Sequence, residues 1–172
     1  MSAEEVKGLD DSGDDQNISL LSKEGRKYEV GKKAASQSNL IKTSLDGDKE
    51  ATEIVLKHIE GPIVEKVIAY MNYHKDVPPR QIDKPLTSAN LKELVDDFDA
   101  KFADVDQETM FKLVLAANYL DVKSLLNLMC AKVASLMKGK TPEQIRRVFN
   151  IRSDYTPQEE EEVRKKHKDL IG

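Results

Sequence analysis

Residues 106–137 read DQETMFKLVLAANYLDVKSLLNLMCAKVASLM, and this stretch decides the fold class. Apolar residues recur in it every three or four positions, which is the spacing of one face of an α-helix. Asp106 can cap a first helix that runs to about Leu120, and Asp121 can cap a second one. Lys138-Gly139 supplies a stop, because glycine readily adopts the left-handed conformation that ends a helix. The pattern therefore predicts two consecutive helices.

The first of these helices is apolar on two faces. One face carries Met110, Leu113, Val114 and Ala117, and the other carries Phe111, Leu115 and Tyr119. A helix that is wet on one side needs only one apolar stripe, so we expect this helix to be central and contacted from both sides. On the second helix, Cys130 shares the apolar stripe with Leu126 and Val133, which predicts a small buried hydrophobic residue and not a nucleophile.

Two further helices are predicted downstream, each with a capping box. Thr141-Pro142-Glu143-Gln144 and Thr156-Pro157-Gln158-Glu159 both place a capping Thr, a first-turn Pro and a third-position Gln or Glu. These helices are poor in apolar residues, so they cannot offset their ordering entropy in isolation. We expect them to lie on the preceding helices or to be completed by a partner. They are the main indication of a protein-binding region.

The N-terminal part of the chain predicts a small sheet followed by a helix. Residues 18–21 and 26–30 are short strand-like runs joined by a turn at Gly25. Residues 53–59 resemble a third strand, which places Ile54, Leu56 and His58 on one face. Residues 34–38 and 39–45 are expected to form short helices before that strand. A further helix is expected from Gly61-Pro62, a long proline-containing loop over 76–90, and a partly helical segment over 91–102.

Composition and charge exclude several classes of protein. The 172 residues have a net charge of −4 and no basic face of the kind that follows phosphates, so nucleic-acid binding is not expected. Residues 1–16 are acidic and poor in apolar residues, which predicts a disordered tail and no secretory signal. The single Cys cannot form an internal disulfide, and no run is long and apolar enough to cross a membrane. We expect a protein of the cytoplasm and nucleus.

No constellation of residues predicts catalysis, a cofactor or a metal site. Gly139-Lys140-Thr141 resembles the end of a phosphate-binding loop, but Ala134 stands where that motif needs Gly, so a helix stop followed by a cap is the better interpretation. The three His residues are far apart and do not have metal-ligand spacing. Asp96, Asp97 and Asp99 are interpreted as a solvated loop or helix end. The chain is predicted not to be an enzyme.

Several motifs resemble a known family. Residues 41–43 (IKT), 73–76 (YHKD), 115–121 (LAANYLD) and 138–151 (KGKTPEQIRRVFNI) are similar, in order and spacing, to the S-phase kinase-associated protein one family, the adaptors of SCF ubiquitin ligases. The resemblance covers roughly residues 17–168. It implies an α-rich α/β fold, with a BTB/POZ domain over 17–138 and two C-terminal extension helices over 139–172. It also implies an adaptor that joins a cullin to F-box substrate receptors and meets a RING protein only indirectly.

The resemblance also implies roles for individual residues. The expected cullin contacts are Asn118 and Tyr119, with Ile41, Lys42 and Thr43 as further candidates. The expected F-box contacts are Phe111, Leu115, Leu126, Cys130, Val133, Ile145, Phe149 and Ile151. Pro142 matches a proline that is hydroxylated and then glycosylated in some protist members. Ordinary roles in capping and core packing are the alternative for all of these residues.

The sequence departs from the family pattern in places, and other functions stay open. Phe98 stands where the family carries Trp, and residues 167–172 (HKDLIG) replace an ending with a Trp-Cys pair and acids, which puts receptor choice in doubt. The main alternative is a scaffold of the same fold, in a kinetochore or assembly factor, that binds F-box-like partners without a cullin. An elongin C-like adaptor is disfavoured by the two extra helices. Weak homodimerisation of the free chain stays open.

Overall fold

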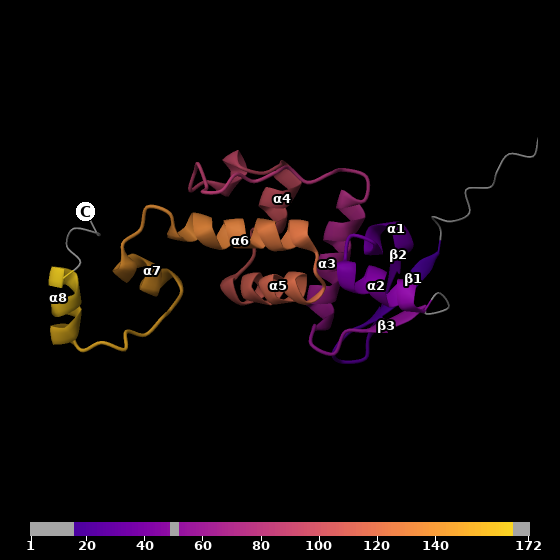
Figure 1. Ribbon diagram of the computed structural model, residues 1–172, viewed down its shortest axis with the longest axis horizontal. Helices are drawn as coiled ribbons and strands as arrows, with labels where there is room; N and C mark the ends of the chain where they lie inside the picture. The colour runs from indigo at the N-terminus through magenta and orange to yellow at the C-terminus, as the bar shows by residue number, and fades with distance from the viewer. Residues whose placement is uncertain (1–15, 49–51, 167–172) are drawn as a thin grey trace, which may run out of the picture.

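A computed structural model describes residues 16–48 and 52–166. Figure 1 shows a small sheet at one end of the molecule, a helical body in the middle, and the last two helices at the other end. The sheet end contains β1 (Asn17–Leu21), β2 (Lys27–Gly31), α1 (Lys32–Ala35), α2 (Asn39–Gly47) and β3 (Glu53–Val55). The remaining elements are α3 (Gly61–His74), a 3-10 turn (Leu91–Glu93), α4 (Asp97–Phe102), α5 (Gln107–Tyr119), α6 (Lys123–Met137), α7 (Pro142–Val148) and α8 (Pro157–Lys166).

The sheet has the order β2-β1-β3. β1 pairs antiparallel with β2 and parallel with β3, so that Leu20 lies opposite both Tyr28 and Ile54. Gly25 has φ +76°, which confirms the predicted hairpin turn. The third strand is shorter than predicted. The chain turns after Leu56, whose carbonyl accepts a hydrogen bond from the Ile59 amide at 3.3 Å, and this turn leaves His58 exposed.

The core lies where α3, α5 and α6 pack together beside the sheet. Its largest fully buried side chains include Tyr70 from α3, Leu113 from α5 and Leu125 from α6. The predicted cap of α5 is confirmed, since the Asp106 carboxylate accepts a hydrogen bond from the Thr109 amide at 2.9 Å. The predicted stop of α6 is confirmed as well, with Gly139 at φ +72°.

The predicted cap of α6 is wrong. Val122 precedes the helix and makes no side-chain capping bond, whereas Asp121 has φ +50° in the tight turn between the helices. The Asp121 carboxylate instead accepts a hydrogen bond from the Asn39 side-chain amide at 2.8 Å. A contact across 82 positions has therefore replaced the local cap that the sequence favoured.

A buried polar pair joins α3 to α4. His74 Nε2 lies 2.9 Å from Asp99 Oδ1, and both side chains are almost completely inaccessible to solvent. His74 Nδ1 lies 2.7 Å from the carbonyl oxygen of Val77, at the start of the long loop. The prediction that Asp99 is solvated is therefore wrong, while its neighbours Asp96 and Asp97 are exposed as expected. Sequence spacing gave no signal that a His 25 residues away would meet Asp99.

Gly61, the first residue of α3, is expected to tolerate no side chain. A Cβ at Gly61 would clash with Tyr28 Oη, and the Gly61 amide also donates a hydrogen bond to Glu24 at 3.0 Å. Gly61→Ala should lower the free energy of unfolding by about 1–3 kcal/mol, measured by urea denaturation. Gly47→Ala is the matched control, because it also replaces a helical Gly with Ala, but the added Cβ meets open space. Equal stability of the two variants would contradict the expectation.

Candidate functional site: two partner-binding surfaces

One face of α5 is open in the free chain. Met110, Leu113 and Ala117 are buried, whereas Phe111, Leu115 and Tyr119 are 40%, 69% and 36% exposed. The prediction that both faces of α5 are covered is therefore wrong for the chain by itself. Periodicity reveals that a face is apolar, but it does not say which element or which partner covers it. A large exposed apolar stripe of this kind marks a surface for association.

The end of α5 is joined to the start of α2. The carbonyl of Leu120 accepts hydrogen bonds from the Leu40 amide at 3.3 Å and from the Ser38 hydroxyl at 2.5 Å. The carbonyl of Asp121 accepts one from the Asn39 amide at 3.3 Å. These bonds fix two segments that the sequence analysis selected separately, one with Asn118 and Tyr119 and the other with residues 41–43.

Not all of these predicted contacts are accessible. Asn118, Tyr119, Lys42 and Thr43 are exposed, so each can meet a partner. Ile41 is completely buried, because the first turn of α2 packs that side chain into the core. Ile41 therefore supports the surface from beneath and cannot contact a partner in this conformation. The motif formed by residues 41–43 gave no indication that Ile41 is buried while Lys42 and Thr43 are exposed.

A hollow of about 370 Å³ adjoins Tyr119. Its lining residues come from the β3–α3 connection, from the first turn of α3 and from α5: His58, Ile59, Glu60, Ile63, Lys112, Leu115, Ala116, Asn118 and Tyr119. The His58 ring meets the Tyr119 ring edge-on, with 5.7 Å between centroids. Sequence reasoning missed His58 and Lys112, because their approach depends on the turn after β3. Leu115, which was assigned to the other surface, lies in this hollow beside Tyr119.

An ion-pair cluster forms the rim of this hollow. Lys112 Nζ lies 2.8 Å from a Glu60 oxygen and 2.7 Å from a Glu108 oxygen. Glu108 and then Glu60 hold the pKa of the Lys112 ammonium well above its usual range. The cluster connects α5 to the residue that precedes α3. It gives the rim two carboxylates for one ammonium, so this edge of the surface is acidic.

The second surface lies at the junction of α5, α6 and α7. The rings of Phe111 and Phe149 are in contact, with 6.0 Å between centroids. Ile145 and Phe149 are half-buried, and Ile151 is 54% exposed. Within the described chain, neither α7 nor α8 contains a buried residue. This confirms the prediction that the two helices are thinly covered.

The α6 residues of the second surface differ from one another in exposure. Leu126 and Val133 are half-buried, but Cys130 is exposed, so the prediction that Cys130 is buried is wrong. Cys130 lines a largely apolar hollow of about 430 Å³ between α6 and the long loop, together with Pro85 and Leu86. Helical spacing predicted the apolar stripe of α6 correctly, but the long loop that faces Cys130 does not cover its thiol.

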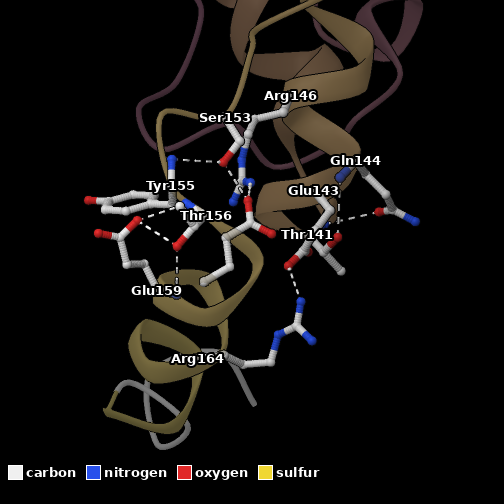
Figure 2. A network of polar contacts seen from close by, with 10 residues as sticks. Thr141, Glu143, Gln144, Arg146, Ser153, Tyr155, Thr156, Glu159 and Arg164 are labelled. Carbon is white, nitrogen blue, oxygen red and sulfur yellow. Dashed lines mark hydrogen bonds and ion pairs between the residues drawn. The ribbon is translucent and has the colours of Figure 1, made fainter.

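Polar contacts hold α8 beside α7, as Figure 2 shows. The predicted capping box at Thr141 and Gln144 is formed, and so is the one at Thr156 and Glu159. Two ion pairs cross between the helices: Arg146 to Glu160 at 2.7 Å and Arg164 to Glu143 at 3.0 Å. The Ser153 hydroxyl also donates to Glu160 at 2.5 Å.

The carboxyl groups of this network have lowered pKa values. For Glu160, the hydrogen bond from Ser153 is the main cause of the lower pKa, and the Arg146 guanidinium adds to it. For Glu143, a hydrogen bond from its own backbone amide and one from Thr141 lower the pKa, and Arg164 contributes further. Both side chains are therefore negative at neutral pH, and both ion pairs are charged.

The described residues contain no group of three or more His, Cys, Asp or Glu side chains that could hold a metal ion, and no helix among them is long and apolar enough to span a membrane. Gly139-Lys140-Thr141 ends one helix and caps the next, as interpreted from the sequence. Pro142 is exposed at the first position of α7. Its modification stays a prediction.

Comparison with known proteins identifies the family. A model for the Skp1 family tetramerisation domain matches residues 16–76, and one for the Skp1 family dimerisation domain matches residues 123–170. An S-phase kinase-associated protein 1 homolog from Tetrahymena thermophila is 46% identical over 152 residues, which are 88% of this chain and 92% of that protein. The chain belongs to the Skp1 family.

Other Skp1 family relatives carry names that state their assembly. An SCF ubiquitin ligase complex protein, SKP1a, from Dictyostelium discoideum is 40% identical over 151 residues, covering 87% of this chain and 93% of the relative. An E3 ubiquitin ligase complex SCF subunit, sconC, from Arthroderma benhamiae is 39% identical over 151 residues, covering 87% and 92%. Family membership and the small sheet with its many helices confirm the expected BTB/POZ-like α/β fold.

Two departures from the family pattern were expected from the sequence of this Skp1 family member. Phe98 stacks on Tyr73 with 3.6 Å between ring centroids, and its correspondence to a family Trp stays a prediction. The divergent ending over 167–172 lies outside the described residues, as does the acidic tail apart from Gln16. The predicted domain boundary at 138/139 stays a prediction.

Proposed function

We propose that this chain is the adaptor subunit of an SCF-type ubiquitin ligase, which links a cullin to F-box substrate receptors. The observation that carries the proposal is the open α5 face with thinly covered helices at one end of it. Relatives that match this chain over nearly their full length are named as SCF subunits. The Skp1 family consists of adaptors and not of catalysts, so we propose that this chain does no chemistry of its own.

The F-box receptor is proposed to bind at the α5–α6–α7 junction. Phe111 and Phe149 form an aromatic contact that a partner can extend, and Ile151 offers exposed apolar area next to it. Binding there would remove apolar surface from water, which is the main favourable term in association. Leu126, Val133 and Ile145 support this surface from half-buried positions, and the exposed Cys130 lies on α6 between Leu126 and Val133.

The cullin is proposed to bind at the joined ends of α5 and α2. Asn118, Tyr119, Lys42 and Thr43 supply exposed groups there, and the hollow beside Tyr119 offers an apolar socket with an acidic rim. Leu115 lines this hollow, whereas Phe111, nearer the start of α5, belongs to the proposed F-box surface. Binding of both partners at the same time is therefore compatible with this arrangement, as an adaptor requires.

Tyr119→Ala is expected to weaken cullin binding by roughly 10- to 100-fold, because a buried aromatic anchor at an interface contributes about 1–3 kcal/mol. The affinity of the purified chain for a cullin N-terminal domain would be measured by calorimetry. Tyr155→Ala is the matched control, since Tyr155 is also exposed but lies near α8. The assignment is wrong if both variants bind the cullin equally well.

Co-purification from native lysate tests the whole proposal. The full chain should capture both F-box proteins and a cullin, identified by mass spectrometry. Capture of F-box-like partners without a cullin would favour the alternative scaffold. We further propose that the chain works in the cytoplasm and nucleus, without nucleic acid and without a cofactor. Fluorescence from a tagged chain and nuclease treatment of the captured complex test these points.

A further inference from the structure

Ion pairs join α8 to α7, and neither helix contains a buried residue. Every side chain that the structure describes in α8 is at least partly exposed, and so is every side chain in α7. The contacts that cross between the helices are Arg146–Glu160 and Arg164–Glu143. Each helix thus supplies one acid and one base, and the two pairs cross the space between them (Figure 2). We call these four side chains the α7–α8 clasp.

The clasp is reinforced from within the connecting segment. Ser153, between the two helices, donates a hydrogen bond to Glu160, the same carboxylate that Arg146 meets. Thr156 and Glu159 close the capping box that starts α8. Each helix therefore begins at a defined residue, and the clasp sets the angle at which the second helix leaves the first.

We propose that Glu143, Arg146, Glu160 and Arg164 are positioning residues of the F-box surface, which hold α8 in a preset arrangement before the receptor arrives. The inference rests on the proposed function, because it assigns a role at the same surface. The clasp keeps the exposed Ile151, Tyr155 and Val163 at fixed spacing in the free chain. The four charged side chains need not contact the receptor themselves.

The physical reason is that a helix already ordered in the free chain loses little conformational entropy on binding, so the interaction with the receptor does not have to offset that loss. A segment that must become ordered on association lowers affinity, and rigidifying it in the bound arrangement recovers that loss. Exposed ion pairs contribute little to overall stability, so the fold does not depend on the clasp.

A distance measurement in the free chain tests the clasp directly. Spin labels can be attached to the exposed native Cys130 on α6 and to an introduced Glu162→Cys on α8. Pulsed electron–electron double resonance then gives the distribution of distances between the two labels. We expect a narrow distribution at low salt that broadens in Glu143→Arg. The charge swap Glu143→Arg with Arg164→Glu should restore most of the narrow component. High salt should broaden the original distribution, because the pairs are exposed to screening.

Receptor binding is the second readout. Glu143→Arg should weaken F-box binding by about fivefold or more, and the swap should recover most of the loss, as expected for groups that act through each other. Glu162→Arg is the matched control for affinity, since Glu162 is exposed on α8 and is not one of the four clasp residues. It changes the net charge by the same amount as Glu143→Arg and should leave the affinity for the F-box protein unchanged.

The outcomes separate the two proposals. An unchanged distance distribution in Glu143→Arg, or equal loss of affinity in the single variant and the swap, would overturn the positioning role. Equal weakening by Glu162→Arg would overturn it too, since net charge alone would then explain the effect. If no F-box protein binds the original chain, the proposed function fails, and the positioning role fails with it even where the distances show an intact clasp.

Discussion

Replacing Asp99 with alanine is expected to lower the free energy of unfolding by about 1–3 kcal/mol, which is the usual cost of leaving a buried polar group without its hydrogen-bond partner. The Val77 carbonyl can only accept, so His74 Nδ1 must donate to it, and Nε2 depends on Asp99 for its own partner. Without the carboxylate, a ring nitrogen is left buried and unpaired. Urea denaturation followed by circular dichroism measures the loss.

Two variants control for this expectation. Asp97→Ala removes an exposed carboxylate two positions earlier in the same helix, and it should cost less than about 1 kcal/mol. Asp99→Asn keeps an acceptor oxygen and removes the charge, so its cost should lie between those of the two alanine variants. If Asp99→Ala is no more damaging than Asp97→Ala, the buried pair does not stabilise the fold as described.

Replacing Phe149 with alanine is expected to weaken F-box binding by roughly 30- to 300-fold, which corresponds to about 2–3.5 kcal/mol for an aromatic anchor at the centre of an interface. Phe149 is half-buried, and its ring contact with Phe111 leaves room for a partner to complete its cover. Truncation removes the side chain that connects α7 to the open face of α5. Calorimetry with a purified F-box protein measures the change.

The specificity of this effect can be checked on the same protein. Cullin binding should stay within about twofold, because Phe149 lies at the other end of α5 from Tyr119. Arg147→Ala, an exposed change in the same helix, should leave both affinities unchanged. An equal fall in cullin and F-box affinity would indicate that Phe149→Ala disturbs the whole fold, and a thermal melt would reveal it.

The comparison of sequence with structure separates two kinds of prediction. Helix positions and ends were predictable, as the Asp106 cap, the capping boxes at Thr141 and Thr156, and the stop at Gly139 illustrate. The family was also predictable from the sequence, because the resemblance to the Skp adaptors depends on short motifs. Accessibility was predicted less well: Ile41 and Asp99 are buried and Cys130 is exposed, all contrary to expectation.

The sequence by itself determined most of the elements of this protein, the caps at Asp106, Thr141 and Thr156, the apolar faces of α5 and α6, and its family. The helices, caps and apolar faces follow from interactions between residues three or four positions apart, and this spacing is visible in the sequence. Only the tertiary structure decided that His74 meets Asp99, that Asp121 turns to Asn39, and that Leu115 shares a hollow with Tyr119. The reason is that these contacts join segments far apart in the chain. The partners of the two polar pairs are separated by 25 and 82 residues, and a local sequence pattern does not encode which distant segments will meet.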